Sequence, residues 1–148
     1  MTHMFRYCNK LVNVSLANFD TSNVEDFTRM FFECSELTEL PIQNFNTEKA
    51  KRMEGMFQEC FALTSLDVSN FNTKSVTIMK RMFDNCNSLT SLDISNFNTD
   101  IAEDISDMFN GCINLVVSSV EDEKIMEELQ NANITIQNDT YYLEGNDY

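Results

Sequence analysis

"RMFDNCNSLTSLDISNFNT" occupies residues 81–99, and the nearly identical "GMFQECFALTSLDVSNFNT" occupies residues 55–73, twenty-six positions earlier. The same spacing runs through the whole chain. It relates the cysteines Cys8, Cys34, Cys60, Cys86 and Cys112, and likewise the leucines Leu11, Leu37, Leu63, Leu89 and Leu115. Several residue types keep one register over five copies without an insertion, which is typical of a stack built from one supersecondary unit.

Each repeat contains two shorter periods. Its first half carries apolar residues three, three, one and three positions apart, and this spacing predicts one face of a helix of about three turns. In the fourth repeat these residues are Val76, Met79, Met82, Phe83 and Cys86. Leu92 and Ile94 then alternate with polar residues, which predicts a short strand. "NFNT" follows as a turn, after which Thr73 or Ser75 is suited to cap the next helix.

One strand and one helix per repeat predict an α/β repeat fold, namely a leucine-rich-repeat solenoid whose short strands stack in parallel. We expect the solenoid to span residues 1–120 in about five coils. The first coil is truncated, which indicates either that the sequence is a fragment of a longer chain or that the open first coil packs against a partner. Residues 121–148 are expected to form a C-terminal cap, with a helix and strands in "NITIQ" and "TYYLE". The helix would bury Ile125, Met126 and Leu129.

The pattern M-x-x-M-F-x-x-C-x-x-L-x-x-L-D-(I/V)-S-N-F-N-T resembles the repeat of BspA-like leucine-rich-repeat surface proteins. This group includes a domain of unknown function in mycoplasma lipoproteins. The resemblance covers residues 1 to about 120, and it implies a cell-surface or secreted protein that adheres to host proteins or other cells. Two features depart from the pattern: the first repeat starts partway through its helix, and Ser118 stands where Leu is expected. Against the general leucine-rich-repeat pattern, Phe97 stands where Asn or Cys is usual.

The chain is strongly acidic, with a net charge of −14. Half of that charge lies in residues 121–148, which carry eight acidic residues and one Lys. Such a surface repels phosphate backbones and anionic lipids, so nucleic acid and membrane surfaces are not expected partners. No long apolar run predicts a membrane span. No signal peptide opens the chain, so a cytoplasmic location stays open beside the surface location that the resemblance implies.

The five cysteines occupy equivalent positions on the apolar side of their repeats. We expect them to form a structural ladder of reduced, buried thiols, because free Cys packs as a small hydrophobe. Equivalent positions suit a disulfide framework poorly. No metal site or other cofactor is expected, since the chain has a single histidine, His3, and no C-x-x-C pair. No nucleophile-and-base pair indicates catalysis, so the chain is predicted not to be an enzyme.

The outward residues of the third and fourth strands are the candidate binding residues. They are Thr64, Ser65, Asp67, Ser69, Thr90, Ser91, Asp93 and Ser95. The carboxylates of Asp67 and Asp93 would also suit a small calcium site, but only two repeats carry this Asp. The opposite side carries a basic band between acidic coils, so the sequence does not decide which side binds.

The leading hypothesis is a non-enzymatic surface adhesion module that binds a protein or glycan on another cell or matrix through the sheet face. The alternative is a structural spacer or assembly module that stacks, or self-associates, through its open N-terminal coil.

Overall fold

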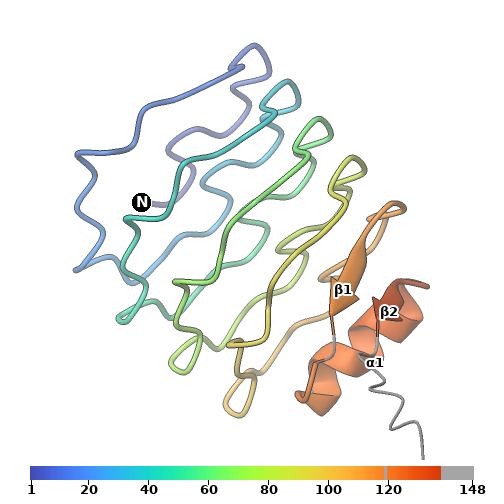
Figure 1. Cartoon of the computed structure of the whole chain (residues 1–148). Coiled ribbons are helices and arrows are strands. Elements are labelled where there is room, and N and C mark those ends of the chain that lie inside the picture. The colour runs from blue at the N-terminus through green and yellow to red at the C-terminus, as the bar shows by residue number, and fades with distance from the viewer. Residues whose placement is uncertain (119, 138–148) are drawn as a thin grey trace, which may run out of the picture.

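The computed structural model describes residues 1–118 and 120–137, which wind into successive coils that lie side by side (Figure 1). We number the coils by their residues: coil 1 is 1–26, coil 2 is 27–52, coil 3 is 53–78, coil 4 is 79–104 and coil 5 is 105–118. The named elements are strand β1 (Val116–Ser118), helix α1 (Glu123–Asn131) and strand β2 (Thr135–Gln137). β1 and β2 pair in parallel, with Val116 opposite Thr135.

The helix predicted in the first half of each repeat is wrong for the described coils, which contain tight turns there instead. Backbone amides in this half alternate between two kinds of acceptor. Met82 N–H donates within its own turn to Met79 O at 3.1 Å, whereas Phe83 N–H donates to Met108 O of the next coil at 2.9 Å. The backbone has positive φ at Arg81 (55°) and at equivalent positions, which a right-handed helix cannot contain. Apolar residues three apart fit successive turns as well as they fit a helix.

A ladder of backbone hydrogen bonds joins the coils, and its register is constant. Each acceptor carbonyl belongs to the residue that comes just before the donor's counterpart in the next repeat. In coils 1 to 4, every second amide of the turn region donates to a carbonyl of the following coil, at 2.7–3.0 Å. Gly55 N–H, for example, donates to Lys80 O at 2.9 Å. The neighbouring coil therefore satisfies the amides that an α-helix would satisfy internally, and this explains why the turns need no helix.

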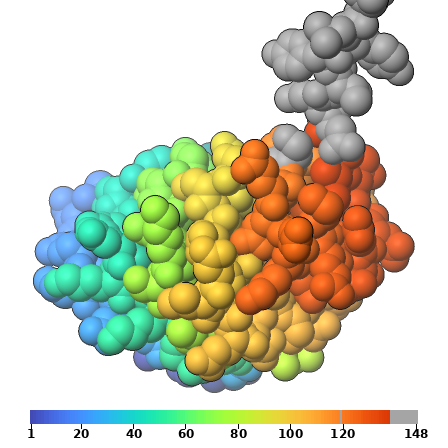
Figure 2. All heavy atoms as spheres, turned by 90° about the horizontal axis from the view of Figure 1, so that it is seen from below, coloured from blue at the N-terminus to red at the C-terminus, as the bar shows by residue number. Residues whose placement is uncertain are grey.

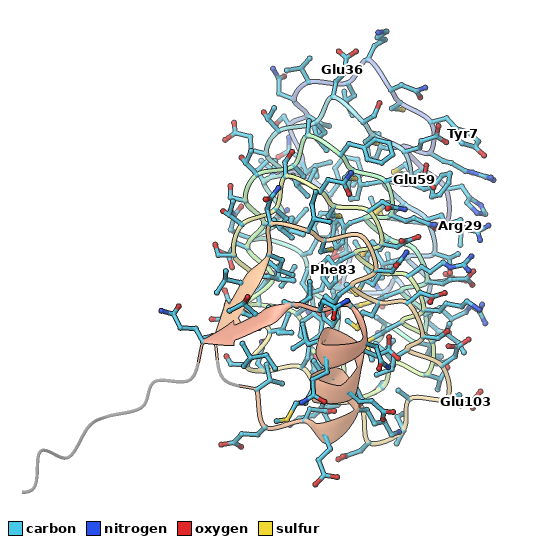
Figure 3. All side chains as sticks on the ribbon, turned by 90° about the vertical axis from the view of Figure 1, so that its right-hand side faces the viewer. Tyr7, Arg29, Glu36, Glu59, Phe83 and Glu103 are labelled. Carbon is cyan, nitrogen blue, oxygen red and sulfur yellow. The ribbon has the colours of Figure 1, made fainter. Side chains whose placement is uncertain are left out.

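The core is a set of residue columns that run through the stack. Five phenylalanine rings stack with centroids 5.3–6.0 Å apart and planes within 11° of parallel, at Phe5, Phe31, Phe57, Phe83 and Phe109. Figure 3 shows Phe83 in the interior, while Tyr7, Arg29 and Glu59 lie toward the side away from β1 and β2. The core predicted for one repeat is confirmed, because all its members are at most 5% exposed: Met82, Phe83, Cys86, Leu89, Leu92, Ile94 and Phe97.

A column of threonines corrects the capping expectation. Thr73 is fully buried and caps no helix. Its hydroxyl donates to Asn98 O at 3.0 Å and accepts from Asn98 N–H at 2.7 Å, so it binds both backbone groups of one residue in the next coil. Thr21 and Thr47 make the same pair of bonds to their following coils.

The strand predicted in each repeat is present only in coil 5, as β1, and the corresponding segments of coils 1 to 4 are not strands. The predicted alternation of burial nevertheless holds there, with Leu92 and Ile94 buried and Asp93 exposed between them. The parallel bridge between Ser91 and Val116 joins coil 4 to coil 5 in a register one position shorter than a full repeat. This shift puts Val117 in the core position that Leu92 fills. Ser118 is consequently exposed, which explains the departure from the leucine pattern.

α1 closes the far end of the stack against coil 5 (Figures 1 and 2). Asp122 caps the helix by accepting hydrogen bonds from the amides of Lys124 and Ile125. Ile125 and Leu129 are fully buried in the common core, and Met126 is only partly buried. β2 lies within the predicted "NITIQ" strand, and the predicted "TYYLE" strand lies outside the described residues.

No helix in the described ranges is long and apolar enough to cross a membrane. α1 itself has nine residues.

Candidate functional site

An open groove of about 920 Å³ runs over the strand side of the stack. Every coil contributes to it, and so does β2. From coil 1 to β2 its lining includes Asn13, Glu39, Ser65, Ser91, Val116 and Gln137. The ladder brings these residues together although they are far apart in the sequence, because each coil adds one residue to the same row. The groove is therefore a surface of the whole stack, and no single repeat could form it.

Five of the eight predicted binding residues line this groove, namely Ser65, Asp67, Thr90, Ser91 and Asp93. The other three lie beside it and have structural partners. The amide and hydroxyl of Thr64 both donate to Thr38 O, at 3.1 and 3.3 Å. Ser69 and Ser95 each donate to the aspartate two residues earlier. These serines position the carboxylates of the groove without lining it.

The groove carries negative charge. Glu39, Asp67 and Asp93 line it, and no Lys or Arg does so among the described residues. The Ser69 hydroxyl (2.6 Å) and amide (3.0 Å) donate to Asp67 and hold the pKa of its carboxyl below the ordinary value. Ser95 lowers the pKa of Asp93 in the same way, against a smaller opposing effect of the Asp67 charge. Both aspartates are thus ionised at neutral pH and fixed in orientation by short turns.

Several lining residues were not among the predicted binding residues, including the polar residues Asn13, Glu39 and Gln137. Asn13 stands two repeats before Ser65 and Glu39 stands one repeat before it, so the register of the repeats already put both in its row. The prediction compared only the third and fourth repeats, so it missed both residues. Gln137 could not have been found this way, because β2 lies beyond the repeats.

The groove offers few ligands to a cation. Within residues 1–118 and 120–137, no three His, Cys, Asp or Glu side chains are grouped so as to share a metal ion. In addition, one oxygen of Asp67 already accepts two hydrogen bonds from Ser69. Ser119, which stands one repeat after Asp93, lies outside the described residues.

The thiol column is structural. Cys34, Cys60, Cys86 and Cys112 are buried, and each thiol donates to a phenylalanine carbonyl of the preceding coil, at 3.0–3.2 Å. Burial raises the pKa of Cys34 and Cys112 to about 12 and also raises that of Cys60 and Cys86. They therefore stay protonated and unreactive at neutral pH.

Cys8 corrects the expectation that all five thiols are buried. It is only partly buried, as are Phe5 and Leu11 of the same coil.

The basic residues of the opposite side are paired with acidic residues of neighbouring coils. Lys51 contacts Glu25 at 2.8 Å, and Arg81 contacts Asp107 at 3.1 Å. Arg29 contacts Glu54 at 3.2 Å. The predicted basic band is thus largely neutralised by ion pairs between coils.

A protein-family model described as "Mycoplasma protein of unknown function, DUF285" matches residues 1–123. Among curated proteins and among solved structures, none matches the chain.

Proposed function

The chain belongs to the DUF285 family of Mycoplasma proteins, whose function is unknown, and we propose that it is a non-enzymatic binding module that holds an extended polypeptide in its groove. The occupant is a chain segment rich in Lys or Arg. We further propose that the stacked coils are a leucine-rich-repeat solenoid of BspA-like type, and that the module works in adhesion at the cell surface or outside the cell.

One observation carries the proposal: the groove crosses every coil and is acidic along its middle. Glu39, Asp67 and Asp93 come from three consecutive coils, and no basic side chain among the described residues lines the groove. Neighbouring strands lie about 4.8 Å apart, so ionised carboxylates in adjacent coils repel one another, and a cationic ligand relieves this repulsion. A neutral glycan would leave the repulsion in place, which favours a polypeptide.

The dimensions suit an extended segment. Six layers from coil 1 to β2 make five steps of about 4.8 Å, or about 24 Å. An extended chain covers this length with about seven residues at about 3.3 Å each.

The composition of the groove supports a binding role over catalysis. Its rows repeat Ser, Thr and Asp in similar surroundings, whereas an active site needs groups with different environments. The single histidine, His3, is exposed and does not line the groove.

A fluorescent octalysine is the probe that tests this function. Asp67→Asn together with Asp93→Asn should weaken its binding about fivefold, since each exposed charge pair contributes about 0.5 kcal/mol. The matched control is Asp20→Asn with Asp100→Asn, which removes the same charge from exposed turns outside the groove. Equal weakening in both pairs would show that only net charge matters and would refute the groove. Stronger binding of a neutral oligosaccharide than of octalysine would favour a glycan.

A second candidate is a structural assembly module. The observation that favours it is the burial in coil 1, where Phe5, Cys8 and Leu11 are only partly buried although their counterparts in coil 2 are fully buried. Sedimentation of the wild-type chain tests this role, and a monomer at every concentration counts against it.

A further inference from the structure

The strand side of the stack is tied together at its margins and not in the middle. At one margin of coils 2 and 3, Thr64 N–H donates to Thr38 O at 3.1 Å. At the other margin, Asn70 Nδ2 donates to Ile42 O at 3.2 Å and to Phe45 O at 2.7 Å. Between these margins no hydrogen bond joins the two coils within the described residues, and the groove lies over this untied middle.

Four residues of this middle have free backbone groups. They are Ser65 and Asp67 in coil 3 and Ser91 and Asp93 in coil 4, and all four are exposed and line the groove. Among the residues that the structure describes, their amides donate no hydrogen bond and their carbonyls accept none. The turn side of the same coils differs, because there every second amide donates to a carbonyl of the next coil.

Asp67 and Asp93 each combine an anion with a main-chain donor. Each carboxylate accepts hydrogen bonds from the serine two residues later, so it does not occupy the amide of its own residue. The carboxylate can therefore bind a cationic side chain while the amide binds a carbonyl of the same ligand. A polypeptide rich in Lys or Arg supplies both groups, whereas a simple polyamine supplies only the cations.

The free amides distinguish these two kinds of polycation. In the unbound chain, exposed amides and carbonyls form hydrogen bonds with water. A ligand that covers them has to replace those bonds, because a covered donor or acceptor without a partner is destabilising. The main chain of a peptide replaces them with its own carbonyls and N–H groups, as happens when a peptide adds to the edge of a sheet.

We propose that the groove recognises the main chain of its occupant as well as its charge, through the free amides and carbonyls of Ser65, Asp67, Ser91 and Asp93. This inference rests on the proposed function and narrows its ligand to an extended cationic segment whose peptide groups are free to form hydrogen bonds. Coil 2 does not contribute a donor beside Asp67, because the counterpart of Asp67 there is Pro41, which has no N–H.

Proline substitution tests the inference from the side of the groove. Asp67→Pro and Asp67→Asn both remove the charge, but only Asp67→Pro also removes the amide N–H. The fold accepts proline at this position of the repeat, since Pro41 occupies it in coil 2. Octalysine should bind Asp67→Pro about fivefold more weakly than Asp67→Asn, which corresponds to the net contribution of one hydrogen bond. Isothermal titration calorimetry at constant salt measures both affinities.

Spermine is the control for any distortion that the proline causes. It carries amines but no carbonyl, so it cannot accept a hydrogen bond from the amide of Asp67. Its affinity should therefore be the same for Asp67→Pro and Asp67→Asn. An equal extra loss for spermine and octalysine would assign the loss to distortion, and the comparison of ligands below then decides.

The ligand can be varied instead, with the wild-type chain unchanged. Octalysine methylated at its peptide nitrogens keeps its charges and carbonyls but has no main-chain N–H. It should bind the chain at least about fivefold more weakly than octalysine, because the free carbonyls of the groove lose their donors. Heparin, which binds both peptides through charge, is the control, and its affinity for the two should be equal.

Two results overturn the inference and leave the proposed function standing. One is equal binding of octalysine to Asp67→Pro and Asp67→Asn. The other is binding of methylated octalysine to the wild-type chain as tightly as octalysine itself. Failure of octalysine to bind the wild-type chain at all refutes the proposed function, and the inference fails with it.

Discussion

The buried threonine column gives the sharpest prediction about stability. Thr73→Val keeps the shape of the side chain and removes its hydroxyl. Thr73 is fully buried, and its hydroxyl makes both a 3.0 Å bond to Asn98 O and a 2.7 Å bond from Asn98 N–H. Among the residues that the structure describes, these two backbone groups have no other hydrogen-bond partner. Two lost bonds at about 1 kcal/mol each, with both backbone groups left unpaired, predict a loss of about 2–3 kcal/mol in the free energy of unfolding.

Urea unfolding followed by circular dichroism measures this loss. Thr64→Val is the matched control, because Thr64 is exposed. Its hydroxyl donates to Thr38 O, but its own amide donates to the same carbonyl, so that acceptor stays paired in the variant. The control should change stability by less than about 0.5 kcal/mol. A Thr73→Val variant as stable as the control would refute the claim that side-chain hydroxyls bind one coil to the next.

Three other outcomes follow from the same geometry. With a thiol reagent under native conditions, Cys8 should react at once and the four buried thiols only on unfolding, so more than one fast thiol would contradict the buried column. Gly55→Ala should cost about 1 kcal/mol in urea unfolding, because φ is +54° there and the added Cβ would lie 2.9 Å from Gln58 Oε1; an unchanged midpoint would argue against the left-handed turn. Burial tends to raise the pKa of Asp122, but its hydrogen bonds, led by that from the Thr99 side chain, lower the pKa overall. The ionised Asp122 carboxylate therefore stabilises the fold above the ordinary carboxyl pKa, and this stabilisation is lost as the pH falls through the lowered pKa. The stability difference between wild type and Thr99→Val should therefore shrink below about pH 4, and a difference independent of pH would contradict this coupling.

Much of the interior could be predicted because a fixed repeat period places equivalent residues on top of one another. Phe83 and Cys86 were identified as core from their columns alone, and both are fully buried. The C-terminal helix was also predictable, since its acidic start and apolar spacing are independent of the repeats.

The helix within each repeat was mispredicted for a physical reason. Residues three apart along the chain share a side both in a helix and in successive turns, so the apolar pattern cannot distinguish them. The feature that distinguishes the turns from a helix is positive φ. Glycine indicates positive φ in a sequence, but of these positions only Gly55 and Gly111 are glycines, and the others are residues such as Arg81 and Glu59.

The candidate groove was partly predictable. Asp67 and Asp93 stood out as outward residues of the predicted strands, and both line it. Its extent was not predictable, because β2 joins the stack from outside the repeat and coil 5 shifts its strand by one residue.

The length dependence of cationic peptide binding tests the groove most directly. Oligolysines from four to twelve residues are titrated against the wild-type chain at constant salt. An extended chain fills the groove of about 24 Å with about seven residues, so affinity should rise steeply up to about that length and then level off. The plateau should fall when Asp67 and Asp93 are replaced by Asn. Affinity that keeps rising with peptide charge beyond that length, or that ignores these two substitutions, would contradict a groove that binds an extended chain.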